Sequence, residues 1–97
     1  MFAVVMTVEL HVPASGSLKA KRGVVKSIAA RLRNDLKVSV AEVDHQDLWQ
    51  RATLGVAIAA GSEVGARRVA QQVEKVVSRE PRVEIIGVDI DVVVPER

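Results

Sequence analysis

"KVSVAEVDHQDLWQRATLGVAIAA" (37–60) decides the fold of this 97-residue chain. Apolar residues alternate with small or polar ones over 37–44 and again over 51–60, the spacing of strands with one buried face. Only residues 45–50 separate the two strands, which leaves no room for a helix between them. The middle of the chain is therefore predicted to be two consecutive antiparallel strands.

Outside this pair, the chain alternates between strand and helix patterns. Residues 2–12 alternate as a strand, and 83–94 do so again, with one apolar face made by Ile86, Val88, Ile90, Val92 and Val94. Ser17 is expected to cap a helix that frays at Asn34 and Asp35, with an apolar stripe of Leu18, Val25, Ile28, Ala29, Leu32 and Leu36. Ser62 is expected to cap a second helix that ends before Pro81, with a stripe of Val64, Val69, Val73, Val76 and Val77.

The order strand, helix, strand, strand, helix, strand is the split βαβ motif. Four one-sided strands and two amphipathic helices fit an α+β, ferredoxin-like two-layer sandwich. Right-handed connections then give an antiparallel sheet in the order 4-1-3-2, with both helices on one face. The length predicts a single domain over residues 1–97.

Composition excludes several functions of this fold. Apolar residues make up 48% of the chain, yet Phe2 and Trp49 are the only aromatics and cysteine is absent. Disulfides, iron–sulfur clusters and thiolate metal sites are thereby excluded. The central strands carry no aromatic for stacking RNA bases, and "PASGS" (13–17) lacks the arginine of an acylphosphatase loop. Without a signal-peptide pattern or an 18-residue apolar run, we expect a cytoplasmic protein with no cofactor and no membrane segment.

Basic residues crowd the start of the first helix. Lys19, Lys21 and Arg22 lie where the helix dipole favours acids, and 18–34 holds six basic residues and no acid. Lys19, Arg22, Lys26 and Arg33 fall on one flank. Together with Ser15, Ser17 and the free N–H groups of the helix start, these residues predict a site for phosphate or RNA. A solvated basic face is the simpler interpretation.

The second unusual segment is the connection "DHQDLWQR" (44–51), which the topology places beside the first helix start. Asp44, His45 and Asp47 are metal ligands by type, but turn chemistry explains them better, with Asp47 capping a short helical turn through 48–50. Arg51 is expected to pair with an aspartate. Trp49 either plugs the end of the core, which we favour, or is exposed for stacking or an interface. Glu9 and His11 on the open face are candidates for an acid–base pair, but an exposed salt link is the favoured interpretation.

"SLKAKRGVVKSIAARLRN" (17–34) followed by "VSVAEVDHQDLWQRATLGVA" (38–57) closely resembles the YlxP-like family of small bacterial proteins, a domain of unknown function. The resemblance covers nearly the whole chain and includes Ser17, Leu18, Lys19, Lys21 and Arg22, together with 41–52. It implies a ferredoxin-like fold and carries over no activity. The family's genes often neighbour genes for translation initiation and ribosome maturation, which implies a role near the ribosome or RNA.

Three functions follow from these residues. The first is a non-catalytic module that contacts RNA or the ribosome through the basic flank of the first helix, with Trp49 stacking on a base or ribose. The second is a phosphate-binding regulatory or enzymatic domain, with Ser15, Ser17 and the acid–base group of His45. The third is a homodimeric scaffold that uses the smooth open face of the sheet.

Overall fold

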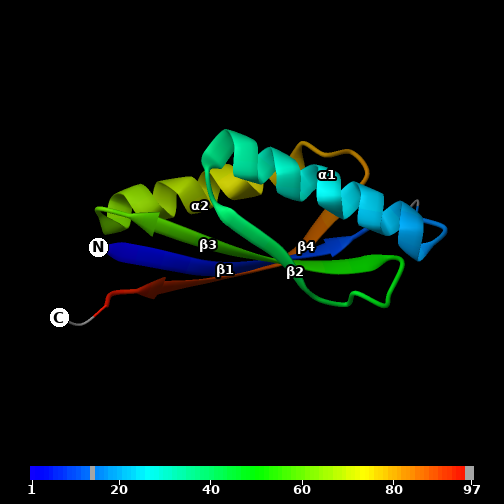
Figure 1. Cartoon of the computed structure of the whole chain (residues 1–97), viewed down its shortest axis with the longest axis horizontal. Coiled ribbons are helices and arrows are strands. Elements are labelled where there is room, and N and C mark those ends of the chain that lie inside the picture. Colours follow the sequence, from blue (N-terminus) through cyan, green and yellow to red (C-terminus); the bar gives the residue numbers. More distant parts are fainter. Residues whose placement is uncertain (14, 96–97) are drawn as a thin grey trace.

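The computed structural model describes residues 1–13 and 15–95 and contains the predicted elements in the predicted order. They are β1 (Phe2–His11), α1 (Leu18–Leu36), β2 (Ser39–Asp44), β3 (Arg51–Ala60), α2 (Glu63–Ser78) and β4 (Glu84–Val93). The strands form one antiparallel sheet in the order β2-β3-β1-β4, and both helices cover the same face (Figure 1). The ferredoxin-like sandwich and its strand order are thus confirmed.

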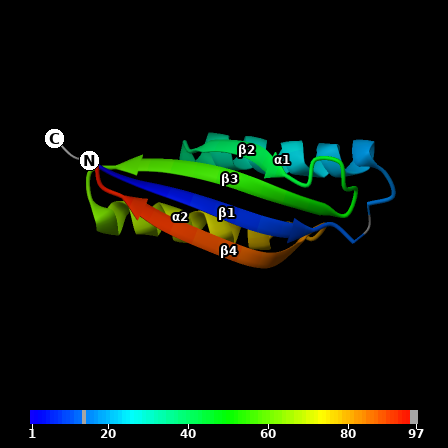
Figure 2. The same cartoon turned by 90° about the horizontal axis from the view of Figure 1, so that it is seen from below.

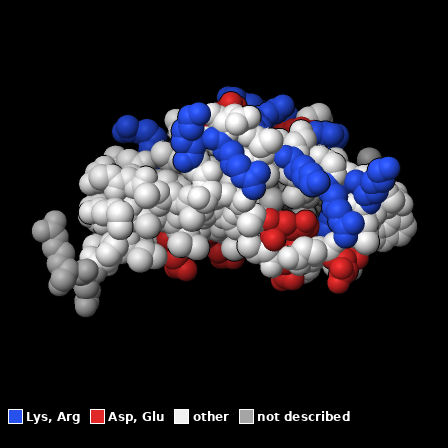
Figure 3. Space-filling model, viewed as in Figure 1, with Lys and Arg blue, Asp and Glu red and all other residues white. Residues whose placement is uncertain are grey.

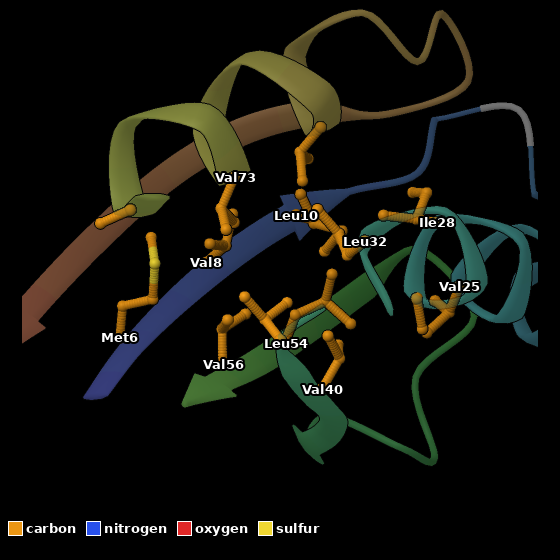
Figure 4. Close-up of a cluster of buried hydrophobic side chains, with 14 of the residues drawn as sticks. Met6, Val8, Leu10, Val25, Ile28, Leu32, Val40, Leu54, Val56 and Val73 are labelled. Atoms are coloured by element: carbon orange, nitrogen blue, oxygen red, sulfur yellow. The ribbon is translucent and has the colours of Figure 1, made fainter. Parts of the chain in front are cut away.

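The core lies between the sheet and the two helices and is aliphatic, as the composition requires. Every second residue of β1 from Val4 to Leu10 is at most 1% exposed, because this face of the central strand meets both helices. Leu54 and Val56 of β3 extend the same layer, and the helices close it with Ile28, Leu32 and Val73 (Figure 4). Removing this surface from water is the main force that holds the two layers together.

Both helices begin as predicted, at a serine. The hydroxyls of Ser17 and Ser62 each accept a hydrogen bond from the backbone N–H three residues later, at 3.0 Å. α1 ends at Leu36, the last residue of its predicted stripe, because Lys37 adopts a left-handed conformation (φ 57°) and donates its N–H to the carbonyl of Arg33. Because Lys37 belongs to this cap, β2 begins at Ser39 and not at residue 37.

Two apolar side chains, one in β4 and one in α2, lie outside the faces predicted for them. The β1–β4 register shifts between Glu9 and Leu10, so that Ile86 leaves the helix-facing row and is 49% exposed. The prediction that Ile86 shares a face with Val88 is wrong for this reason, since alternation fails across a β-bulge. Val64 is also outside the core, 68% exposed on the first turn of α2, where small Ala66 and Ala70 make the buried contacts instead.

The second bulge is in β2, where Val43 has no register partner between Glu42 and Asp44. Val43 lies over Gly55 of β3: a Cβ atom at Gly55 would come within 2.7 Å of the Val43 Cγ1. Glycine therefore leaves room for Val43 at this position. Glu42 precedes the bulge and follows Val40 by two residues, so normal alternation places it in the row that faces α1, where its carboxylate contacts Lys21.

Candidate functional site

The loop before α1 and the β2–β3 connection meet at one end of the molecule, as the topology predicts. Both lie at the same end of the sheet in two perpendicular views (Figures 1 and 2). The N–H of Val12 donates to the carbonyl of Gln50 at 2.9 Å, and the side chain of Lys21 reaches across from α1. Two segments more than twenty residues apart in sequence are therefore joined directly.

Lys21 makes the central contact of this junction and is fully buried. Its Nζ donates to the Oε2 of Glu42 at 2.8 Å, and three backbone carbonyls surround the same ammonium: His45 at 2.8 Å, Arg51 at 3.2 Å and Gln46 at 3.3 Å. A buried charge is tolerated when it is paired and its hydrogen bonds are made. Lys21 thus anchors the β2–β3 connection to α1, and its ammonium is not presented to an external phosphate.

The connection itself is a tight turn, not the short helical turn that was predicted at 48–50. The N–H of Leu48 donates to the carbonyl of His45 at 3.0 Å, and His45 adopts a left-handed conformation (φ 61°). The Oδ1 of Asp44 accepts from the N–H of His45 at 2.8 Å, which supports this backbone conformation from the side chain. Asp44 therefore has the turn role that was expected of it.

The ion pairs of the open face also differ from the predicted ones. Arg51 lies 3.6 Å from Glu9 and pairs with it, not with an aspartate of the connection. The Nδ1 of His11 lies 3.8 Å from the Oε2 of Glu84, so Glu9 and His11 do not pair with each other. Both partners come from neighbouring strands of the sheet, which sequence spacing alone does not reveal.

Ser15 and Ser17 have internal hydrogen bonds. The hydroxyl of Ser15, only 6% exposed, donates to the backbone carbonyl of Ser17 at 2.9 Å, and the Ser17 hydroxyl caps α1. These contacts assign both serines to the shape of the loop. The phosphate site proposed on their hydroxyls therefore loses its main support.

Trp49 is 51% exposed, and neighbouring Leu48 is 46% exposed. The favoured prediction, that Trp49 plugs the end of the core, is wrong. The core at this end is closed by aliphatic side chains such as Leu10 and Val12, each at most 2% exposed. The indole instead belongs to a loop whose backbone is fixed at both ends by the contacts of Lys21 and Val12.

A groove runs between α1 and the edge strand β2, with a volume of about 650 Å³. Its apolar floor is made by two residues of α1, Val25 and Ala29. Its polar lining consists of Arg22, Lys26, Arg33, Glu42 and Gln46. Figure 3 shows lysine and arginine side chains in a row over α1, with acidic side chains below them along the sheet. The predicted basic flank thus borders a concave surface, with exposed Lys19 one turn before Arg22.

The groove is strongly cationic because its one acid already has a partner. Glu42 forms an ion pair with buried Lys21, so the charges of Arg22, Lys26 and Arg33 are not offset by it. Arg33 also donates from a terminal guanidinium nitrogen to the carbonyl of Val40 at 2.6 Å, and the amide of Gln46 donates to the carbonyl of Glu42 at 3.4 Å. These bonds cover carbonyls of an edge strand and disfavour pairing with a further strand there.

Metal ligation finds no support in the part of the chain that the structure describes. Over residues 1–13 and 15–95, no three acidic, histidine or cysteine side chains form a group suited to a metal ion. The Nδ1 of His45 lies 3.9 Å from the Oδ1 of Asp44, on the turn described above. Within the same residues, neither helix is long and apolar enough to span a bilayer.

Known proteins resemble this chain over most of its length. The model of the family "Protein of unknown function (DUF503)" matches residues 3–90. The chain belongs to this family. The "Uncharacterized protein YlxP" of Bacillus subtilis (strain 168) is 39% identical over 70 residues, which cover 72% of this chain and 76% of that protein. The resemblance seen in the sequence is therefore confirmed, and this family has no assigned activity to transfer.

Two solved structures that are similar to this chain are designed proteins. The de novo designed protein LFR1 1 with ferredoxin fold superposes with a TM-score of 0.59 at 13% identity, covering 98% of this chain and 88% of its own. The de novo designed protein Foldit4 gives 0.57 at 12% identity, covering 99% and 100%. At such identities the likeness concerns the fold alone.

Proposed function

We propose that this protein is a non-catalytic binding module that contacts RNA, free or in the ribosome, through the α1–β2 groove. The observation that carries the proposal is the row of cations along one wall of a concave surface whose single acid is neutralised from within. Lys19, Arg22, Lys26 and Arg33 would contact phosphates, which supply most of the affinity of sequence-independent binding. Lys21, first expected among these contacts, instead neutralises Glu42 and fixes the loop.

The spacing of the cations suits a nucleic acid backbone. Lys19 and Arg33 are 14 residues apart on one helix, which corresponds to about 21 Å along its axis. At roughly 3.4 Å per stacked nucleotide, this length matches about six nucleotides. Site sizes of about 4–16 nucleotides are typical of small single-strand-binding folds, so one helix flank is long enough to hold such a segment.

The proposal is tested by capture of RNA from a bacterial lysate at low salt, with half of each sample treated with ribonuclease. The wild type is compared with Lys19→Glu/Arg22→Glu and with a control of the same charge change on the other helix, Arg68→Glu/Lys75→Glu. All four of these side chains belong to exposed residues. We expect ribosomal RNA or ribosomal subunits with the wild type and the control, but not with the α1 variant. Equal recovery with both variants, or no RNA with the wild type, would overturn the proposal.

A second candidate function is a homodimer through the open face of the sheet. Val5, Ile86 and Val93 are 44–51% exposed, and a shallow hollow lined by small residues of β2 and β3 adjoins Val5. Glu9, Asp89 and Asp91 lie on the same face, however, and two copies face to face would bring these acids together. Light scattering at micromolar concentration and raised salt tests this candidate, and a monomer under those conditions contradicts it.

A further inference from the structure

We infer that the RNA bound in the α1–β2 groove is single-stranded and that Trp49 stacks on one of its bases. This inference rests on the proposed function and adds the class of RNA and the group that recognises it. It begins from an exposed tryptophan in a chain that has no other and only one further aromatic residue.

The backbone of the loop that carries Trp49 is attached to the rest of the molecule by hydrogen bonds on both sides of this residue. The Lys21 ammonium binds the carbonyls of His45 and Gln46 before it and of Arg51 after it. Val12 binds the carbonyl of Gln50, the next residue in the chain. A side chain presented on a fixed backbone loses little conformational freedom when a ligand binds, which favours affinity.

The same loop is continuous with the groove. Gln46 lines the groove and lies three residues before Trp49, and its amide also binds β2 through the carbonyl of Glu42. A strand whose phosphates follow Arg22 and Lys26 thus runs toward the loop that displays the indole. A base turned out of such a strand offers a flat face to an aromatic side chain, whereas bases inside a duplex are already stacked on each other.

The covered edge of β2 favours RNA over an acidic polypeptide as the occupant of the groove. Acidic peptides that dock beside a sheet commonly add a strand to its edge. Here the edge carbonyls of Val40 and Glu42 accept hydrogen bonds from Arg33 and Gln46. The groove therefore offers cations and an apolar floor but a covered edge, which suits a phosphate backbone better than an added strand.

The sole tryptophan makes the test direct, because the intrinsic fluorescence of the protein reports on Trp49 alone. The wild type is titrated with an oligouridine of about 12 nucleotides, a length within the range that such sites occupy. A blunt RNA duplex of the same length and a polyglutamate of similar charge serve as competitors. We expect quenching by the single strand, tighter binding of the single strand than of the duplex, and no displacement by polyglutamate.

Variants separate stacking from charge. Trp49→Ala is expected to weaken binding of the single strand by about 10-fold, as measured by anisotropy of a labelled oligouridine, with the salt dependence unchanged. Trp49→Phe should recover most of this loss, and the melting temperature should stay constant because the indole is half exposed. The inference is overturned, while RNA binding stands, if duplex and single strand bind equally and Trp49→Ala has no effect. Both proposals fall if neither RNA binds, or if polyglutamate displaces RNA on equal terms.

Discussion

The two helices of this sandwich are built alike but charged differently. Each begins at a serine cap and packs a largely aliphatic stripe on the same face of the sheet. α2 follows the helix dipole, with Glu63 in its first turn paired to Arg67 at 3.1 Å. α1 has no acid in its first turn and borders the groove with Arg22, Lys26 and Arg33. Because α2 forms with a serine cap and a buried stripe but without such a row of cations, the exposed Arg22 and Lys26 of α1 are surplus to folding and available for a ligand.

Lys21 is the exception among the cations of α1, and its replacement should have the largest effect on stability. Lys21→Met leaves the Glu42 carboxylate and three carbonyls without their donor. We expect a loss of about 3 kcal/mol in the free energy of unfolding, which for a chain of this size lowers the melting temperature by about 15 °C. Chemical denaturation checks the first value and calorimetry the second. Lys75→Met on α2 serves as the control and should change stability by less than about 0.5 kcal/mol.

The surplus cations should show the opposite behaviour, with a large effect on binding and a small one on folding. Arg22→Glu/Lys26→Glu is expected to weaken binding of an RNA oligonucleotide by more than about 10-fold at low salt. The melting temperature should change by only a few degrees, since both residues are exposed. Comparable losses of stability in this variant and in Lys21→Met would remove the distinction between structural and surplus charge.

Gly55 tests whether the β2 bulge depends on a glycine beneath Val43. Gly55→Ala places a Cβ within 2.7 Å of the Val43 side chain, which must then shift. We expect a loss of about 1 kcal/mol, measured by denaturant titration. In a Val43→Ala background the same substitution should be neutral or stabilising, because the clash is gone and alanine suits a strand better than glycine. The same loss in both backgrounds would show that the contact is unimportant.

The smallest effect is expected at the α2–β4 turn and depends on pH. Hydrogen bonds from the side chain of Arg82 to Glu80 hold the pKa of Glu80 below its usual value of 4.5. A carboxylate with a lowered pKa in the folded state stabilises the fold above the unfolded-state pKa, and this contribution disappears as the pH falls through the folded-state value. Glu80→Gln should therefore be less stable than the wild type at neutral pH and approach it below pH 4.5. A constant difference across an acid titration would contradict the assignment.

Much of the fold could be predicted from the sequence because its strands and helices have different apolar periods. Exceptions arise where local geometry interrupts a period, as at the bulges of Val43 and Ile86. Lys21 is instructive, since it occupies the position of the α1 stripe between Leu18 and Val25 where an apolar residue is missing. Lys21 was nevertheless predicted as a phosphate or RNA contact, because its partners come from β2 and the following loop and are not visible in the spacing.

The candidate site could be predicted only in part, because some of its contacts depend on the tertiary structure and not on local spacing. The meeting of the two loops and the basic flank follow from topology and helical spacing, and the structure confirms both. The exposure of Trp49 could not be predicted, because it depends on Leu10 and Val12 already closing the core. The pairing of Arg51 with Glu9 depends likewise on strand register, which no single segment encodes.

The salt dependence of RNA binding tests the central claim most directly. With three to four phosphate contacts to a single strand, the logarithm of the affinity should fall against the logarithm of salt concentration with a slope of about −2 to −3. That is roughly a 30-fold loss between about 50 and 200 mM salt. Arg22→Glu/Lys26→Glu should flatten the slope by at least about 1.4, while Arg68→Glu/Lys75→Glu on α2 should leave it unchanged. A flat wild-type titration, or an equal change in both variants, would contradict the assignment of the α1–β2 groove as the RNA-binding surface.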